Sequence, residues 1–338
     1  MLNGKNVLIT GGTGTLGRAL TKEIINRFPK VNKLVVFSRD ELKQFEMSEE
    51  LPEKNNPMIR YFIGDIRDYK RLRRAMEGID YVIHTAALKQ VPAAEYNPIE
   101  FIKTNIIGTQ NIIEASMDND VKGVVGLSTD KASGPINLYG ATKLCSDKLF
   151  VAANKYKGSR DLTFSIVRYG NVMGSRGSVI PLFIRKAKEE NSLPITDSRM
   201  TRFNISLDQG VDMVLWALLN AKCGEIFVPK IPSFHITELA KSIGPTCDII
   251  NIGIRPGEKI HEEMISESES IYTVDLGKYY AILPTSGKYT ADEYCEKFNG
   301  ETVKEGFTYN SGKNDKFLSS EELTKLIIAN VDENFQPI

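Results

Sequence analysis

The first 170 residues alternate between two hydrophobic periods, and this alternation limits the possible folds more than any other feature of the chain. Short runs of β-branched residues predict strands at Asn6–Thr10, Leu34–Phe37, Ile59–Ile63, Tyr81–His84, Val124–Leu127 and Thr163–Val167. Stretches with helical spacing separate them, at Leu16–Phe28, Leu42–Glu49, Tyr69–Met76, Ile99–Met117 and Tyr139–Tyr156. Strands that alternate with helices form right-handed βαβ units, which build a parallel sheet covered on both faces. We therefore expect an α/β fold, a doubly wound parallel sheet of the Rossmann type.

The alternation ends at about residue 170, where Pro and Gly become frequent. Residues 205–221 predict one helix, and Glu225–Val228 predicts a strand that returns to the sheet. The segment Thr285–Asn314 is rich in Gly, Lys, Asn and Thr, which predicts a loop. We expect two parts: a dinucleotide-binding domain, and a smaller α+β lobe that binds substrate. Their expected ranges are 1–170 plus about 204–229 for the domain, and about 171–203 plus 230–338 for the lobe.

Composition excludes several classes of partner. Lys plus Arg and Asp plus Glu both number 43, and a balanced charge argues against a sequence-independent nucleic-acid binder. The four cysteines are widely spaced, so neither a disulfide framework nor a metal site is expected. The first strand begins too early to leave room for a signal peptide, and the densest apolar run, Val214–Leu219, is too short to span a bilayer. We expect a cytoplasmic protein without nucleic-acid or membrane partners.

The first predicted strand ends in Thr10-Gly11-Gly12-Thr13-Gly14-Thr15-Leu16-Gly17, and a predicted helix follows. Glycine at Gly11, Gly14 and Gly17 allows a tight turn, close approach of the backbone to a pyrophosphate, and close packing of helix on strand. The N–H groups at the start of the helix then face the anion. A glycine triplet can also serve only a turn, but a strand before it and a helix after it favour a dinucleotide site.

The end of the second strand indicates which dinucleotide is bound. NAD sites usually carry an acidic residue there, whereas this chain has Ser38-Arg39. A guanidinium is a fork of donors that matches a phosphate, so we expect NADP. In the alternative interpretation, Arg39 is a surface residue and Asp40 binds the ribose. The full set of expected cofactor contacts is Gly11, Thr13, Gly14, Thr15, Leu16, Gly17, Ser38, Arg39, Asp40, Lys43, Asp65, Ile66, Ala86, Ala87, Tyr139 and Lys143.

Tyr139 and Lys143 are spaced four apart in a predicted helix and therefore share a face. A cationic Lys143 beside the phenol would lower the pKa of Tyr139 toward neutral pH and make it a general base. Thr129, at the end of the fifth strand, offers a hydroxyl to the same substrate oxygen. In the alternative interpretation, Tyr139 and Lys143 are surface residues of a helix without a catalytic role. A second Tyr-x-x-x-Lys, at Tyr309, lies in a loop-like region and is interpreted as coincidence.

Together, the glycine motif, Thr129, Tyr139 and Lys143 resemble the extended short-chain dehydrogenase/reductases. Further segments narrow the resemblance to the inverting UDP-N-acetylglucosamine 4,6-dehydratases, over residues 1 to about 265. These segments are Ala86-Ala87-Leu88-Lys89-Gln90-Val91-Pro92, Leu127-Ser128-Thr129-Asp130-Lys131-Ala132, Asn137-Leu138-Tyr139-Gly140-Ala141-Thr142-Lys143, Arg168-Tyr169-Gly170-Asn171-Val172 and Ile254-Arg255-Pro256-Gly257-Glu258-Lys259.

The pair Asp130-Lys131 is the informative departure, because the retaining sugar-nucleotide 4,6-dehydratases have Asp-Glu after the Thr. In the implied reaction, Tyr139 takes the proton of the 4-hydroxyl while carbon 4 is oxidised. A base then removes the proton of carbon 5, and an acid protonates the departing 6-hydroxyl. We expect a desolvated and partly neutral Lys131 to be the base, and Asp130 to be the acid. The alternative is an exposed Asp–Lys ion pair in a loop.

The resemblance also implies where the substrate binds. We expect contacts from Lys89 and Asn171, and from Arg202, Arg255 and Glu258 in the second lobe. Two guanidinium groups suit the diphosphate of UDP-N-acetylglucosamine, although either Arg could instead form an internal ion pair. The product would enter pseudaminic acid synthesis and flagellin glycosylation, or capsule sugars. We also expect a homo-oligomer.

Two other functions compete with this one. A UDP-sugar 4-epimerase shares the Thr, Tyr and Lys but needs no acid–base pair for carbons 5 and 6, so Asp130-Lys131 counts against it. A non-catalytic NADP-binding sensor has no need of an intact set of Thr129, Tyr139 and Lys143, so it is disfavoured as well.

Overall fold

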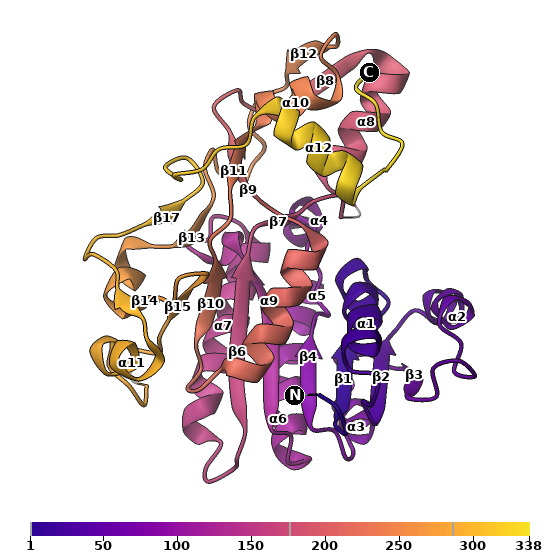
Figure 1. The fold of residues 1–338 in the computed structure, drawn as a ribbon, viewed down its shortest axis with the longest axis vertical. Helices are drawn as coiled ribbons and strands as arrows, with labels where there is room; N and C mark the ends of the chain where they lie inside the picture. Colours follow the sequence, from indigo (N-terminus) through magenta and orange to yellow (C-terminus); the bar gives the residue numbers. More distant parts are fainter. Residues whose placement is uncertain (1, 176, 286) are drawn as a thin grey trace.

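A ten-stranded sheet forms the centre of the computed structural model, which describes residues 2–175, 177–285 and 287–338 (Figure 1). Seven of its strands are parallel, in the order β3-β2-β1-β4-β5-β6-β10. Their bounds are β1 Asn6–Thr10, β2 Lys33–Ser38, β3 Ile59–Ile63, β4 Tyr81–His84, β5 Gly123–Thr129, β6 Thr163–Tyr169 and β10 Ile226–Pro229. This order is that of a doubly wound dinucleotide-binding sheet. The predicted fold class is confirmed, as is the return of the strand after residue 225 to the sheet.

Helices cover both faces of the parallel strands. On one face α1 packs against α9, and on the other α6 packs between α3 and α7. The bounds of the covering helices are α1 Thr15–Arg27, α2 Glu41–Glu50, α3 Tyr69–Ala75, α6 Gly108–Asp118, α7 Leu138–Tyr156 and α9 Leu207–Asn220. Side chains fix where they begin: Asn137 accepts a hydrogen bond from the backbone N–H of Gly140 at the start of α7, and Ser206 with Gln209 forms a capping box at α9.

The helix predicted over Ile99–Met117 is interrupted. The structure has α4 Val91–Tyr96, α5 Pro98–Phe101 and a π-helical segment Ile102–Ile107 before α6. The π segment contains Asn105, whose side-chain amide bonds both the N–H and the C=O of Leu88 at 2.9 Å and the hydroxyl of Thr142 at 3.0 Å. Segments of this kind often stand at functional sites. Here it ties the loop after β4 to α7, the helix that carries Tyr139.

The sheet extends further than expected. β14 Thr273–Asp275, β15 Tyr279–Ile282 and β16 Glu301–Thr302 continue it beyond β10 as antiparallel strands, although they lie in the range assigned to the smaller lobe. The prediction of a loop over Thr285–Asn314 is also wrong. That segment holds α11 Ala291–Phe298, begun by a Thr290–Glu293 capping box, and β17 Tyr309–Asn310. Many of the polar residues that suggested a loop lie on the exposed faces of these elements, while Tyr294 and Tyr309 are buried.

The remaining elements form a lobe. Those at the top of Figure 1, among them α8, β8, α10 and α12, share a hydrophobic core of their own, whereas Met264 and Ile265 of β13 belong to the core of the large sheet. Their bounds are β7 Asn171–Val172, α8 Val179–Glu190, β8 Ser192–Ile195, β9 Thr201–Ile205, β11 Ser233–His235, α10 Ile236–Ile243, β12 Asp248–Asn251, β13 Glu263–Ile265 and α12 Ser320–Asn330. The segment between β12 and β13 reaches the carboxyl end of β5, where Lys131 contacts Glu262. Within the described ranges, no helix has the length and apolar character needed to cross a membrane.

Candidate active site

The turn between β1 and α1 has the geometry of a pyrophosphate cradle. Gly11 has φ +65°, and a Cβ there would lie 2.8 Å from the backbone nitrogen of Ala86. A Cβ on Gly17 would lie 2.5 Å from the carbonyl oxygen of Gly11, so strand and helix approach as only glycine allows. Gly14 caps α1 without a side-chain hydrogen bond, which leaves the first N–H groups of the helix for a ligand. These residues fit a dinucleotide phosphate.

The side chains at the end of β2 differ in their exposure. The Arg39 side chain is exposed, and its Nη1 lies 3.6 Å from Oδ2 of Asp65. Ser38 is buried, and its hydroxyl accepts a hydrogen bond of 3.0 Å from Gln44. Ser38 therefore has only its own O–H to offer to a ligand, and Arg39 is the outward donor at this position.

Asp40 has another role in the structure than ribose binding. One carboxylate oxygen accepts from the backbone N–H of Lys43 at 3.0 Å, which caps α2. The other lies 2.6 Å from the ammonium of Lys43. Both oxygens are thus engaged within the first turn of α2, which counts against the alternative in which Asp40 binds the ribose.

The other expected cofactor residues line the carboxyl ends of β3 and β4. Ile66 is buried against Gly108, where a Cβ would lie 2.7 Å from the Ile66 side chain. Buried His84 shares a hydrogen bond of 2.8 Å with Thr10, which joins the ends of β4 and β1 beside the glycine turn. His84 therefore has a structural role at the junction of these two strands. Ala86 and Ala87 lie in the loop after β4. Asn105 fixes this loop through its two hydrogen bonds with the backbone of Leu88, the next residue.

Thr129, Tyr139 and Lys143 are all buried near the end of β5. Burial raises the pKa of Tyr139 to about 12, against the opposing field of Lys131 and a hydrogen bond with Thr129. The expectation that Lys143 lowers this pKa differs from the structure, in which Lys131 is the cation that acts on the phenol. Lys143 instead faces Asp147, and burial lowers the pKa of Lys143 despite that carboxylate.

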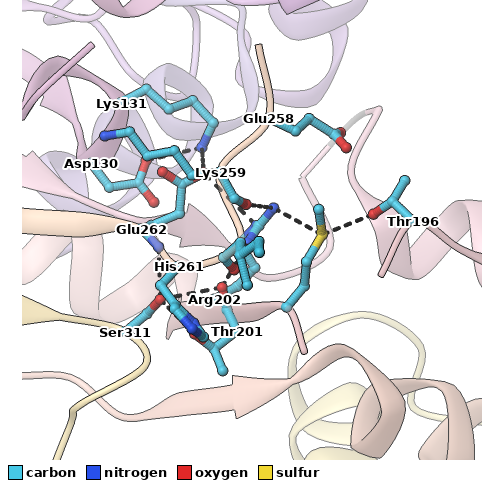
Figure 2. Close-up of polar contacts among 12 residues, drawn as sticks. Asp130, Lys131, Thr196, Thr201, Arg202, Glu258, Lys259, His261, Glu262 and Ser311 are labelled. Atoms are coloured by element: carbon cyan, nitrogen blue, oxygen red, sulfur yellow. Dashed lines mark hydrogen bonds and ion pairs between the residues drawn. The ribbon is translucent and has the colours of Figure 1, made fainter. Parts of the chain in front are cut away.

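Asp130 and Lys131 form an ion pair directly after β5, in which Asp130 is buried and Lys131 is partly buried. The Lys131 ammonium lies 3.0 Å from Oδ1 of Asp130 and 3.2 Å from Oε1 of Glu262 (Figure 2). Asp130 is fully buried and also accepts a hydrogen bond of 2.9 Å from Thr129. The loop ion pair of the alternative interpretation would be exposed, whereas this one belongs to the site.

The expectation of a partly neutral Lys131 is wrong. Burial by itself lowers the pKa of Lys131, but the carboxylates of Asp130 and Glu262 outweigh burial and leave the pKa above its ordinary value. The sequence argument considered burial without the second carboxylate. Lys131 is therefore an ammonium at neutral pH.

Arg202 takes the internal role that was one of its two interpretations. Its guanidinium donates to the carbonyl oxygens of Thr201, Ile260 and Lys259 at 2.7 to 3.0 Å, and its Nε lies 3.8 Å from Glu262. These contacts occupy the N–H groups of Nη1 and Nη2 that would otherwise donate to a diphosphate. Arg202 therefore braces the segment before β13 rather than offering its fork to UDP.

The other expected substrate residues differ in their exposure and contacts. Arg255 is exposed and pairs with Glu258 at 3.3 Å. One carboxylate oxygen of Glu258 is buried without a hydrogen-bond partner among the described residues. Asn171 begins β7 and pairs in register with Asn204. Desolvation, and then the ammonium of Lys131, lower the pKa of Lys89, which places Lys89 near the ion pair.

Sequence reasoning missed two residues that the fold brings to this site. Glu262 lies beside Lys131, and Lys259 donates a hydrogen bond of 2.6 Å to the carbonyl oxygen of Ser133. Both residues come from the lobe, more than a hundred positions after Lys131 in the sequence. At that separation, the spacing between them and Asp130-Lys131 does not indicate that they lie close together. A glutamate in a mixed polar stretch gave no reason to single it out.

Comparisons with known proteins agree with this geometry. The family model described as "Polysaccharide biosynthesis protein" matches residues 7–284. An inverting UDP-N-acetylglucosamine 4,6-dehydratase of Campylobacter jejuni (strain 81-176) is 52% identical over 97% of this chain and 98% of that protein. A UDP-glucose 4-epimerase of Rickettsia felis is 42% identical, over 96% of this chain and 95% of that protein.

Solved structures show the same fold. Pen from Bacillus thuringiensis has a TM-score of 0.88 and 42% identity, over 97% of this chain and 98% of that one. DesIV, a dTDP-glucose 4,6-dehydratase from Streptomyces venezuelae solved with NAD and TYD bound, has a TM-score of 0.66 and 24% identity, over 75% of this chain and 86% of that one. The second likeness concerns the fold alone.

Proposed function

This chain belongs to the polysaccharide biosynthesis protein family, and on that premise we propose that it is an inverting UDP-N-acetylglucosamine 4,6-dehydratase. Its product is UDP-2-acetamido-2,6-dideoxy-L-arabino-hexos-4-ulose. The observation that carries this proposal is the partly buried Asp130–Lys131 ion pair beside Thr129 and Tyr139. Loss of water from carbons 5 and 6 needs an acid and a base, and a 4-epimerase needs no such pair at those carbons.

The cofactor is a nicotinamide dinucleotide, and we propose NADP. When bound, it accepts hydride from carbon 4 and returns hydride to carbon 6. Gly11, Gly14 and Gly17 hold its pyrophosphate, and Arg39 binds the phosphate that distinguishes NADP from NAD. Because hydride returns within each turnover, no net reduction of cofactor is expected.

Tyr139 is the base at the 4-hydroxyl. Thr129 hydrogen-bonds the phenol and positions the same substrate oxygen. The pKa of Tyr139 must fall from about 12 for this role, and the positive charges that favour the phenolate are the ammonium of Lys131 and the oxidised cofactor. Lys143, one helical turn along α7, orients the cofactor.

Asp130 and Lys131 carry the second half of the reaction. Once carbon 4 is a ketone, the proton on carbon 5 becomes acidic. One member of the pair removes that proton, and the other protonates the departing 6-hydroxyl. Conjugation then makes carbon 5 planar, so a proton can return to either face, and inversion is the outcome in the family that the chain resembles.

Substrate and pathway assignments complete the proposal. Arg255 and Lys89 are exposed cations, and we assign the UDP diphosphate to Arg255 and a sugar contact to Lys89. Asn171 and Glu258 provide further contacts. The 4-keto product serves glycan biosynthesis of the pseudaminic acid type, and the enzyme acts as a homo-oligomer in the cytoplasm.

The direct test is incubation of the protein with UDP-N-acetylglucosamine and catalytic NADP. The proposal expects a 4-keto-6-deoxy product with loss of one water, detected by mass spectrometry. A product of unchanged mass, the 4-epimer, would make the protein an epimerase. No conversion together with tight NADP binding would point to a sensor.

A further inference from the structure

Glu262 is a buried carboxylate that the reaction as described above does not use. It is 2% exposed and lies just before β13, in the lobe. Its Oε1 is 3.2 Å from the ammonium of Lys131 and 3.8 Å from Nε of Arg202. Its Oε2 is buried without a hydrogen-bond partner within the described ranges, and Oδ2 of Asp130 is in the same state. Burial of an ionised carboxylate costs free energy unless its charge is paired with an opposite charge and hydrogen-bonded.

Lys131 thus sits between two carboxylates from different parts of the fold. Figure 2 shows its ammonium reached by Asp130 on the β5 side and by Glu262 on the lobe side. The other charged or titratable groups whose fields act on this cluster are Arg202, Lys89 and Tyr139. A cation held by two close carboxylates keeps its proton. Lys131 is therefore a poor candidate for a neutral base.

We propose that Glu262 is a positioning residue that holds Lys131 as a cation, so that Lys131 gives the proton to the departing 6-hydroxyl and Asp130 takes the proton of carbon 5. This assignment rests on the proposed dehydratase function and exchanges the roles that we predicted from the sequence for Asp130 and Lys131. Glu262 acts through Lys131.

The proton balance of this assignment closes within the cluster. An N–H bond of Lys131 breaks and its proton goes to the 6-hydroxyl oxygen, while the carbon 6–oxygen bond breaks and water leaves. The carbon 5–hydrogen bond breaks, its electron pair forms the carbon 5–carbon 6 double bond, and its proton binds the Asp130 carboxylate. Asp130 then returns a proton to the neutral amine of Lys131 across their contact of 3.0 Å. Glu262 stays ionised throughout.

The test is Glu262→Gln, which keeps the shape of the side chain and removes its charge. Loss of a carboxylate lowers the pKa of Lys131, by about one to three units for a close opposite charge. If Lys131 is the acid, its active form is the ammonium. As the pH is raised, the variant should then lose its dehydration activity at a lower pH than the wild type does. If Lys131 were the base, its active form would be the amine, and the variant would gain activity at neutral pH.

We read stopped-flow absorbance at 340 nm from pH 6.5 to 11 with UDP-N-acetylglucosamine and NADP. The reduced cofactor appears on oxidation of carbon 4 and decays only after water is lost. We expect Glu262→Gln to oxidise carbon 4 normally and, above the lowered pKa, to dehydrate about tenfold more slowly for each further pH unit. An unshifted alkaline limb, or faster dehydration at pH 7, overturns the proposal.

Glu263→Gln is the matched control. Glu263 is the next residue and contacts Ser133 at 3.2 Å, but it makes no ion pair with Lys131, so its pH profile should match the wild type. Glu262→Asp keeps the charge and should restore the wild-type alkaline limb even if the shorter side chain slows the reaction. A wild-type protein that forms neither reduced cofactor nor 4-keto product contradicts the dehydratase function itself. A normal wild-type trace with an unshifted Glu262→Gln profile contradicts only the role of Glu262.

Discussion

Arg39 and Asp65 bridge the carboxyl ends of β2 and β3, with 3.6 Å between the guanidinium and the carboxylate. The contact is loose, and Asp65 is bound more closely by Arg67, at 2.7 Å. More than half of the Arg39 side chain is exposed, so its fork can turn toward a phosphate without breaking a tight pair. The acidic residue that follows it, Asp40, is engaged as a helix cap.

We therefore predict that Arg39→Asp weakens NADP binding and spares or improves NAD binding. Loss of a charge-assisted phosphate contact costs about 1.5–3 kcal/mol, or roughly 10- to 100-fold in affinity. Titration calorimetry with both cofactors measures this. Arg73→Asp, on another exposed Arg that pairs with Asp118, is the control and should change neither affinity. Equal losses for NADP and NAD would contradict the role of Arg39.

Tyr139→Phe should abolish the oxidation of carbon 4, because it removes the group that takes the proton of the 4-hydroxyl. General-base catalysis contributes about 10²- to 10⁴-fold, so we expect a loss of that order. No absorbance of reduced cofactor should appear on mixing with substrate. Tyr309→Phe is the control, since that buried phenol bonds the backbone N–H and C=O of Ile231. Normal formation of reduced cofactor by Tyr139→Phe would exclude Tyr139 as the base.

Lys131→Met should separate the two halves of the reaction. Carbon 4 can still be oxidised, because Tyr139 is intact, although more slowly, because the variant lacks the cation that favours the Tyr139 phenolate. Water, however, cannot leave without the ammonium. Reduced cofactor should then accumulate on the enzyme and persist. If Lys131→Met dehydrated the substrate at the wild-type rate, Lys131 would be neither the acid nor the base.

His84 should make the fold sensitive to mild acid. Burial lowers its pKa from 6.5 to about 3, with a further contribution from Lys143. Below pH 6.5 the unfolded chain binds a proton that the folded chain does not, so the free energy of unfolding falls as the pH falls. The slope from this one group is about 1.4 kcal/mol per pH unit.

The measurement is urea unfolding of the wild type and of His84→Asn at pH 7 and 5.5. The variant should lose less stability over this interval than the wild type does, even if it is weaker at both values. His235→Asn, on an exposed histidine stacked on Phe317, is the control. Equal pH dependence in the wild type and His84→Asn would show that His84 does not carry the effect.

The sequence predicted the parts of this molecule that local periodicity determines. The six strands through β6 were placed to within two residues, because buried parallel strands read as short apolar runs. The turn from Gly11 to Gly17 and the spacing of Tyr139 and Lys143 are also local signals. The π segment at Asn105 was missed, since its cause is a contact with Leu88 and Thr142 rather than its own composition.

The charge state of the site depends on contacts across the fold. Lys131 was expected to be partly neutral because it was expected to be desolvated, and the carboxylate that opposes this effect together with Asp130 is Glu262, which comes from the lobe. Arg202 could be a phosphate ligand or an internal brace until the carbonyl groups around it were known. Long-range placement decides both cases, and no spacing rule in the sequence encodes it.

The stereochemistry of the product tests the central claim most directly. The protein is incubated with UDP-N-acetylglucosamine and NADP in heavy water, and proton NMR of the fresh product gives the coupling constants around carbons 4 to 6. We predict the L-arabino 4-keto sugar, with one solvent deuteron at carbon 5 and no net consumption of NADP. A D-xylo product would make the enzyme retaining despite Lys131, and the 4-epimer of the substrate would make it an epimerase; either result would contradict the account.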